Sequence, residues 1–371
     1  MMIRDSIRHF DFILMASALA LVAYGAVLIY SGSLTTHGDG TEALRHPVTR
    51  QLVFASVGVV IALLLSRLDY RALGYGAAGL YGSILAALVF VLVVGSTAYG
   101  SRRWIDFGGT LVQPSEIAKL GIIIVLAKYL SDNQERMKEW RVFLTSLVIA
   151  AVPAALVFAE PDLGSAVIFA AIWLGMVIMA GARARHVLTL LGGFVASVPF
   201  VIVGLLSDYQ RERLALFLDP DKEALGSGFN ILQAEISIGS GGFLGKGLTH
   251  GTQTQLDYLR TQTTDYIFSV LGEELGFVGA VLLFGLFILL LLRGVRAAAV
   301  SRDMLGRLLA TGIVIFILFQ VFINVGVNLR IVPVTGIPLP FVSQGGSSLL
   351  TLFVALGILQ SIVVRHRQIN F

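Results

Sequence analysis

Ten long runs of apolar residues constrain this chain more than any other feature of its sequence. A run of about 20 such residues, wound as an α-helix, spans the hydrocarbon core of a bilayer. We therefore expect an all-α polytopic membrane protein with about ten transmembrane helices, in which residues 1–371 form a single transmembrane domain. The runs cover residues 11–30, 51–66, 73–95, 114–130, 142–159, 163–181, 187–206, 266–292, 308–332 and 346–364.

Composition agrees with this interpretation and excludes several kinds of site. Only 13% of the residues are charged, whereas a soluble domain carries about 25%. The chain has no cysteine, so disulfides, thiolate metal sites and cysteine nucleophiles are excluded. Its six histidines are scattered and form no H-E-x-x-H motif, so we do not expect a zinc site.

The charges orient the chain in the membrane. An even number of spans places both termini on one side, and the loops on that side carry a net charge of +9 against −5 on the other, for a total of +4. Basic loops face the cytoplasm, so we expect both termini there. Because the basic residues lie in short loops between spans, they serve as topology signals, and we expect no nucleic-acid partner.

One connection, residues 207–265, is far longer than the others and forms a large extracytoplasmic loop between spans seven and eight. Phe229, Leu232 and Ile236 share one helical face, which predicts an interfacial helix packed on the bundle. The glycine-rich stretch 239–247 fails the P-loop pattern, because Ser240 stands at its first glycine. We interpret that stretch as a tight, flexible loop and expect no nucleotide.

Ionisable residues at membrane depth are costly and are therefore candidates for function. Arg102, Arg103 and Trp104 lie just before the fourth span, in which Glu116 and Lys119 are three residues apart and share a helical face. An equally weighted alternative is a helix start that carries an ion pair and an interfacial tryptophan.

Two aspartates stand at the outer ends of later spans. Asp162 precedes span six, and Asp265 precedes span eight; either could simply cap its helix. A carboxylate at the lipid–water boundary can also act as a general base, which makes Asp265 the stronger candidate. Glu273 and Glu274 follow two turns later, and because neighbours cannot share one face, at least one must find a structural partner in the bundle.

Residues 338–348 contain two prolines and two glycines close to the last span. This composition predicts a broken or re-entrant segment. Non-helical backbone at that depth must be buried in protein or line a cavity, so the segment, with Ser343 in it, is a further candidate site.

Four motifs resemble the SEDS proteins (shape, elongation, division and sporulation), and the resemblance covers essentially the whole chain. They are G-T-Q-T-Q-L-D-Y-L at 251–259, T-D-Y-I-F at 264–268, L-G-E-E-L-G at 271–276 and P-V-T-G-I-P-L-P-F-V-S at 333–343. The first and last favour the RodA branch over the FtsW branch. The resemblance implies a ten-span enzyme that polymerises lipid II into glycan strands at the outer face of the bacterial cytoplasmic membrane during cell elongation.

The resemblance also implies site residues and a partner. The family's essential aspartate matches Asp265, and other family residues match Trp104, Glu116, Lys119 and Asp162. The implied partner is a class B penicillin-binding protein, which cross-links the strands. The chain departs from the family pattern just before Thr264, at Gln344 and at Arg330, and Arg260 and Arg330 add positive charge where an anion could bind.

An α-linked donor that becomes a β-linked product requires one inverting displacement, for which we assign Asp265 as the general base. The pyrophosphate leaving group needs positive charge. Lys119, Arg102, Arg103, Arg213 or a divalent cation (magnesium or manganese) could supply it. We add Ser343 to the expected substrate-binding residues.

Two other functions stay open. A lipid II flippase would use the same spans, but the gathering of acidic groups on one side favours an enzyme at the outer face. A non-catalytic scaffold for the elongation machinery would not need so many ionisable groups at membrane depth.

Overall fold

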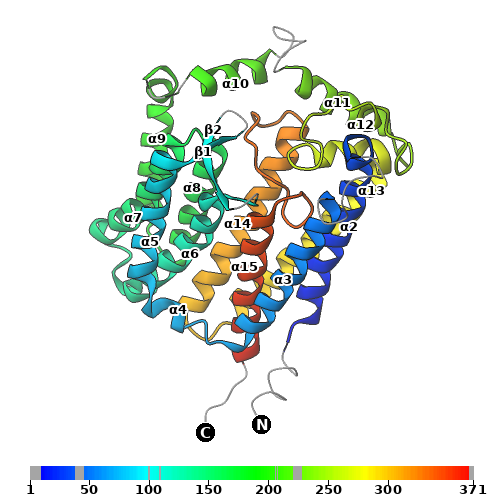
Figure 1. Ribbon diagram of the computed structural model, residues 1–371. Coiled ribbons are helices and arrows are strands. Elements are labelled where there is room, and N and C mark those ends of the chain that lie inside the picture. The colour runs from blue at the N-terminus through cyan, green and yellow to red at the C-terminus, as the bar shows by residue number, and fades with distance from the viewer. Residues whose placement is uncertain are drawn as a thin grey trace.

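The computed structural model describes residues 10–37, 46–98, 101–107, 110–204, 206, 208–219 and 228–366. Long helices run side by side as a bundle, and one end of this bundle carries a small sheet and the helices α10, α11 and α12 (Figure 1). Helix α2 begins and α15 ends at the opposite end of the bundle. This arrangement agrees with the prediction that both termini lie on one side.

Every one of the ten predicted spans is a helix. They are α2 Phe12–His37, α3 Pro47–Arg67, α4 Ala72–Tyr75 with α5 Ala77–Val94, α6 Pro114–Asp132, α7 Trp140–Ala159, α8 Leu163–Met179, α9 Ala184–Gly204, α13 Ile267–Val300, α14 Met304–Asn328 and α15 Gly346–Arg365. Seven of the helices in the described ranges are long and apolar enough to cross a membrane on length and composition alone. Among the others, α8 is slightly shorter, and α6 carries charges within its length.

A small antiparallel sheet, ordered β1-β2-β3, lies between α5 and α6 and is the part of this connection that the all-α expectation omitted. Its strands are β1 Ser96–Ala98, β2 Ser101–Phe107 and β3 Thr110–Val112. Trp104 of β2 pairs with Ser96, and Ile105 pairs with Val112. The sheet holds the backbone of the R-R-W segment against the outer ends of the helices.

The extracytoplasmic connection contains α10 Asp208–Leu218, α11 Phe229–Gly241 and α12 Thr252–Gln255. The predicted helix at 229–238 is confirmed as α11, which packs against α13, but its predicted face is wrong. The buried side of α11 carries Ile231, Ala234 and Ser237, whereas Ile236 is exposed. The packing partner of α11 is the protein itself, so burial follows the fit to α13 rather than the most apolar stripe.

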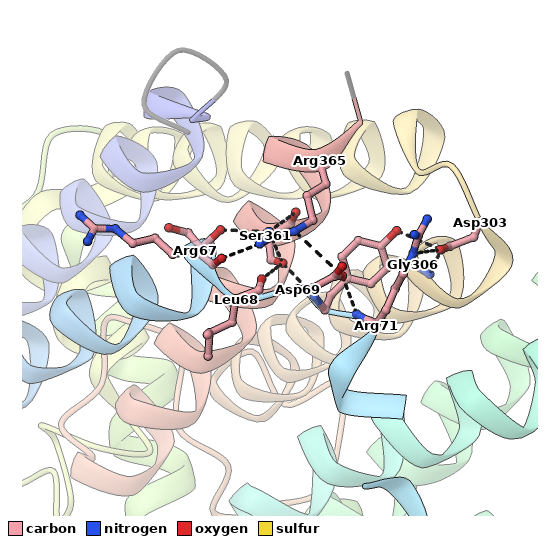
Figure 2. Close-up of polar contacts among 10 residues, drawn as sticks. Arg67, Leu68, Asp69, Arg71, Asp303, Gly306, Ser361 and Arg365 are labelled. Carbon is pink, nitrogen blue, oxygen red and sulfur yellow. Dashed lines mark hydrogen bonds and ion pairs between the residues drawn. The ribbon is translucent and has the colours of Figure 1, made fainter. Parts of the chain in front are cut away.

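At the cytoplasmic end, a cluster of polar contacts joins α3, α14 and α15 (Figure 2). We call this set the cytoplasmic cluster. Arg365 of α15 donates to the backbone carbonyls of Ser66 and Arg67 at the end of α3. Arg71 forms an ion pair with Asp303, which caps the start of α14 through Gly306 N. The members labelled in Figure 2 are Arg67, Leu68, Asp69, Arg71, Asp303, Gly306, Ser361 and Arg365.

Candidate functional site

Arg103 and Asp162 meet at the outer end of the bundle. Arg103 comes from β2, and its Nη1 lies 3.6 Å from Oδ2 of Asp162, with both side chains buried. Asp162 also caps α8, because its Oδ1 accepts a hydrogen bond from Ser165 N at 3.0 Å. Gln113 Nε2 donates to its Oδ2 at 3.2 Å. The capping alternative is therefore correct, and the same carboxylate also faces a buried arginine.

Gly336 brings this arginine beside Asp265. Gly336 has φ of +74°, and a Cβ at that position would lie 3.1 Å from Arg103 Nη2 and 3.7 Å from Asp265 Oδ2. The guanidinium and the second carboxylate therefore converge over a residue that has no side chain. The segment 333–345 that carries Gly336 is non-helical; it includes residues 338–345 of the predicted broken segment, whereas residues 346–348 belong to α15. Three of its side chains, Leu339, Phe341 and Val342, are buried in protein, as non-helical backbone at this depth requires.

The backbone of Asp265 is held from α14. Asn324 Nδ2 and Asn328 Nδ2 both donate to the carbonyl oxygen of Asp265, at 3.1 and 2.9 Å. Asn328 Oδ1 in turn accepts from Ser269 N and Ser269 Oγ. Sequence reasoning missed these amides. Gln320, Asn324 and Asn328 recur every fourth residue within an apolar span, and that spacing was a usable signal, because polar side chains inside the bilayer find partners on neighbouring helices.

Asp265 is a carboxyl group with an altered affinity for protons. Burial raises the pKa of Asp265 above its ordinary value, and the positive charges of Arg103 and Arg213 oppose this rise. Arg213 is anchored nearby, since its Nη1 donates to Val334 O at 3.0 Å. Asp265 lies just before the span of α13, where a raised pKa makes its carboxylate a stronger base near neutral pH.

Two further polar groups in this region have unused hydrogen-bonding capacity. Glu160 is buried, and neither of its oxygens has a hydrogen-bond partner within the described ranges. Burial, with help from the charge of Asp162, raises the pKa of Glu160 to about 8. The Nε of Arg103 is also buried and without a partner among the described residues. Buried polar atoms without partners are rare and call for an explanation such as a ligand. Sequence reasoning assigned no role to Glu160.

Glu116 and Lys119 form a separate buried pair one layer deeper. Lys119 Nζ lies 2.5 Å from Glu116 Oε1, and the side chains are 0% and 2% exposed. Glu116 Oε2 accepts from Gln320 Nε2 of α14, and Lys119 lies over the ring of Phe316. These contacts join α6 to α14, and none of them is with Arg103, Asp162 or Asp265. Their predicted role in substrate binding stays a prediction.

Three more predicted site residues, Ser343, Trp104 and Arg102, differ in how they are placed. Ser343 Oγ donates to Thr264 O at 2.6 Å and accepts from Leu339 N, so this hydroxyl joins two loops. Trp104 is half-buried on β2. The backbone of Arg102 pairs with Thr97, whereas its side chain lies outside the described part of the structure.

The departures from the family pattern have structural roles. Arg330 has φ of +54°, a left-handed conformation that favours glycine. Its guanidinium contacts the carbonyls of Phe217 and Leu218, so it anchors the extracytoplasmic loop. Gln344 and Thr263, two positions that both depart from the pattern, bind each other: Gln344 N donates to Thr263 O, and Thr263 Oγ1 donates to Gln344 Oε1.

The described residues contain no group of three or more His, Asp and Glu side chains that could hold a metal ion. Asp162 and Asp265 already lie beside the guanidinium of Arg103. These donors do not form a metal cage made by the protein alone. A magnesium or manganese ion stays a prediction.

Comparisons with known proteins agree with this architecture. The family described as cell cycle proteins of the FtsW, RodA and SpoVE group matches residues 11–368. Peptidoglycan glycosyltransferase MrdB of Escherichia coli (strain K12) is 36% identical over 98% of this chain and 95% of its own. Stage V sporulation protein E of Bacillus subtilis (strain 168) is 37% identical over 95% of this chain and 96% of its own.

Solved structures give the same result. One chain, from a study of how a peptidoglycan synthase complex coordinates polymerization and crosslinking, matches with a TM-score of 0.82 and 32% identity over 97% of this chain and 99% of its own. The rod shape determining protein RodA of Thermus thermophilus matches with a TM-score of 0.71 and 31% identity over 97% and 98%. The sequence motifs, the ten-helix bundle and these matches together place the chain in the SEDS family, the family of FtsW, RodA and SpoVE.

Proposed function

We propose that this protein is a peptidoglycan glycosyltransferase of the bacterial inner membrane, which polymerises lipid II into glycan strands at the outer face. The observation that carries this proposal is the convergence of Asp265, Arg103 and Asp162 at the outer end of the bundle. Lipid II has a polyprenyl tail that belongs in the bilayer and a sugar that belongs outside. Its reacting atoms therefore lie at the depth of these three residues. The names of the relatives support the same activity.

The reaction requires a base and a cationic site for the leaving group. Asp265 accepts the proton of the acceptor 4-hydroxyl as that oxygen attacks the anomeric carbon of the donor sugar. The bond from this carbon to the pyrophosphate breaks, and the configuration inverts. The raised pKa of Asp265 suits this role, because a stronger base takes more of the proton in the transition state.

Arg103 is the residue best placed to receive the pyrophosphate. Its contact with Asp162, at 3.6 Å, is an ion pair longer than a normal hydrogen bond, and its buried Nε has no partner among the described residues. A guanidinium with unused donors matches the paired oxygens of a phosphate. Arg213, which also acts on Asp265 electrostatically, supplies a second positive charge.

The test is polymerisation of labelled lipid II by purified Asp265→Asn protein. The substitution keeps the shape of the side chain and removes the base, so we expect polymer formation to fall by about 10²- to 10⁴-fold, with unchanged membrane insertion and monodispersity. Wild-type rates for this variant would overturn the base assignment. Wild-type protein in vesicles separates the alternative functions. Transbilayer movement of lipid II without polymer formation would indicate a flippase. If neither activity is seen, even with the partner present, the protein would be a scaffold.

We also propose a class B penicillin-binding protein as the partner of this chain. The support is the structural match to a chain of a peptidoglycan synthase complex, whose study concerns polymerization together with crosslinking. Co-purification from detergent, and polymerisation measured with and without the transpeptidase, tests this pairing. An unchanged rate and no stable complex would contradict it.

A further inference from the structure

The helix that follows Asp265 is interrupted at one residue. Helix α13 runs from Ile267 to Val300, but Gly276 has φ of 62° and ψ of −156°, which no helix contains. Its outer segment, residues 267–275, therefore stands apart from the rest of the span. The break removes the usual helical hydrogen bonds from Phe277 and Val278 back to residues four positions earlier.

All four backbone groups freed at this break bind the glycine-rich hairpin 242–247. Lys246 N and Gly247 N donate to the carbonyls of Glu273 and Glu274, each at 3.0 Å. In the other direction, Phe277 N donates to Gly242 O at 3.0 Å, and Val278 N donates to Phe243 O at 3.1 Å. Buried backbone groups must be paired, so the hairpin and the break stabilise each other. The sequence predicts a tight, flexible loop over 239–247, but residues 239–241 belong to α11, and residues 242–247 form a tight turn.

Glycines allow this close approach of two backbones. A Cβ on Gly241 would overlap the carbonyl oxygen of Gly272, and a Cβ on Gly245 would overlap that of Glu274. Gly245 also has φ of +79°, a conformation that other residues rarely adopt. The hairpin thus fits against the outer segment of α13 without intervening side chains.

The carboxylate of Glu273 connects the hairpin to the helix a second time. Its Oε1 accepts from Lys246 Nζ at 2.8 Å, Thr252 Oγ1 at 3.1 Å and Gln253 N at 3.0 Å. Its Oε2 accepts from Thr254 N at 3.2 Å and Thr254 Oγ1 at 3.1 Å. Five donors therefore surround a fully buried carboxylate, and they come from the hairpin and from α12. The side chain of Glu273 therefore joins the hairpin, α12 and α13.

We propose that hairpin 242–247 is a clasp that fixes the outer segment of α13, and thereby Asp265, against Arg103, with Glu273 as the positioning residue that keeps the clasp closed. This inference rests on the proposed function of Asp265. The segment is held at both ends. Asn324 and Asn328 bind the carbonyl of Asp265 just before its start, and the clasp binds its end. A base displaced by about 1 Å can lose about 10²-fold in rate, so an open clasp lowers turnover while leaving substrate contacts in place.

The experiment compares Glu273→Ala, Lys246→Met and the control Glu235→Ala in the full-length protein. Lys246→Met removes one donor to Glu273 at a partly exposed position, so it remains informative if Glu273→Ala does not fold. Glu235 of α11 also pairs with an arginine, Arg330 after α14, at 3.6 Å, and it takes part in none of the clasp hydrogen bonds given above. Two readouts are taken: kcat and KM for labelled lipid II, and hydrogen–deuterium exchange at the amides of Lys246, Gly247, Phe277 and Val278.

We expect exchange at these four amides to rise at least tenfold in Glu273→Ala, with kcat reduced about tenfold or more and KM within twofold of wild type. Lys246→Met should raise the exchange rate and lower kcat by smaller factors, and Glu235→Ala should change neither the exchange rate nor kcat. Faster exchange with an unchanged kcat would overturn the positioning role. Unchanged exchange in both variants would overturn the clasp itself.

Parallel measurements on Asp265→Asn separate the two proposals. If that variant is inactive while the clasp variants open and keep their kcat, the clasp proposal fails and the proposed function stands. If Asp265→Asn polymerises normally, the general-base assignment fails whatever the exchange data show, and with it the claim that the clasp positions a base.

Discussion

Two arginine–aspartate pairs at opposite ends of this bundle differ in length and in burial. In the cytoplasmic cluster, Arg71 and Asp303 pair at 2.7 Å with side chains 53% and 31% exposed. At the outer end, Arg103 and Asp162 face each other at 3.6 Å with side chains 8% and 2% exposed. Of these two pairs, the cytoplasmic one is short and in contact with water, and the outer one is longer and out of water.

The polar groups of the cytoplasmic cluster complete helix ends. Arg365 donates to carbonyls at the end of α3, and Ser361 Oγ donates to Leu68 O at 2.6 Å (Figure 2). Asp303 accepts from Gly306 N and from Tyr70 Oη. These contacts satisfy backbone groups that every helix leaves unpaired at its ends. The cluster therefore has a complete structural explanation.

The outer groups lack such an explanation. Arg103 Nε and both oxygens of Glu160 are buried without hydrogen-bond partners among the described residues. Leaving a buried polar group unpaired costs about 1–3 kcal/mol, so a fold keeps such groups only where something else requires them. A substrate that binds at the outer end is such a requirement. For these carboxylates and arginines at the two ends, unpaired burial rather than charge itself distinguishes the outer end.

The largest expected effect concerns the Glu116–Lys119 pair, which is buried like the outer site but whose two charges pair directly with each other. Glu116→Ala leaves the ammonium of Lys119 buried without its partner, and we expect a loss of about 3–5 kcal/mol of stability. Thermal unfolding in detergent and the yield of folded protein measure this loss. Normal folding with lost turnover would instead place the pair in the substrate-binding site, as the sequence predicts.

Arg103→Ala should have the next largest effect, this time on turnover. The variant loses the charge that faces the pyrophosphate, and removal of one such electrostatic contact costs about 10²- to 10³-fold in kcat. Polymer formed per folded molecule is the measurement, with Arg71→Ala as the matched arginine of the cytoplasmic end. Equal losses of turnover in the two variants would remove the contrast between the ends.

Gly336→Ala tests the approach of Arg103 to Asp265 without changing either charge. The new methyl group would lie 3.1 Å from Arg103 Nη2, on a backbone with φ of +74°. Strain of about 1–3 kcal/mol is usual for such a conformation, and we expect kcat to fall about tenfold. The steady-state kinetics of the folded variant measure this fall in kcat. A wild-type kcat would mean that the two groups need not converge for turnover.

These tests depend on features that the sequence reveals to different degrees. All ten spans follow from local composition, because the length of an apolar run decides whether a helix can cross the bilayer. Asp162, Asp265 and Arg103 were identifiable because charges at the ends of spans are few. Their convergence depends on Gly336, which lies far along the chain, and no local pattern contains that information.

The features that the sequence did not reveal are contacts between distant segments. The break at Gly276 is stabilised by a hairpin about thirty residues earlier, so its hydrogen bonds cannot be read from α13 alone. The packed face of α11 was wrong for the same reason, since it depends on the fit to α13. The lack of hydrogen-bond partners for Glu160 depends on the residues packed around it, and only the three-dimensional structure shows this.

Glu160 provides a prediction about pH. Its pKa of about 8 in the folded protein lies above the ordinary value of 4.5, so the folded state binds more protons than the unfolded state between these values. Its contribution to stability is therefore full below about pH 4.5 and is lost as pH rises through about 8. Glu160→Gln should gain stability relative to wild type over this range, and the difference should level off above pH 8. Thermal unfolding from pH 5 to 9 measures the difference, and a difference that does not depend on pH would contradict the raised pKa.

The smallest expected effect is that of Arg71→Ala on stability. The ion pair with Asp303 is more than half exposed on the arginine side, and such pairs contribute about 0.2–1 kcal/mol because water screens the charges. Asp303 keeps its hydrogen bonds from Gly306 N and Tyr70 Oη in this variant, so the cap of α14 survives. Thermal unfolding at low and high salt should show a small loss that nearly disappears at high salt. A loss that matches Glu116→Ala and persists in salt would show that the cytoplasmic charges are as critical as the buried ones, and unpaired burial would then no longer distinguish the two ends.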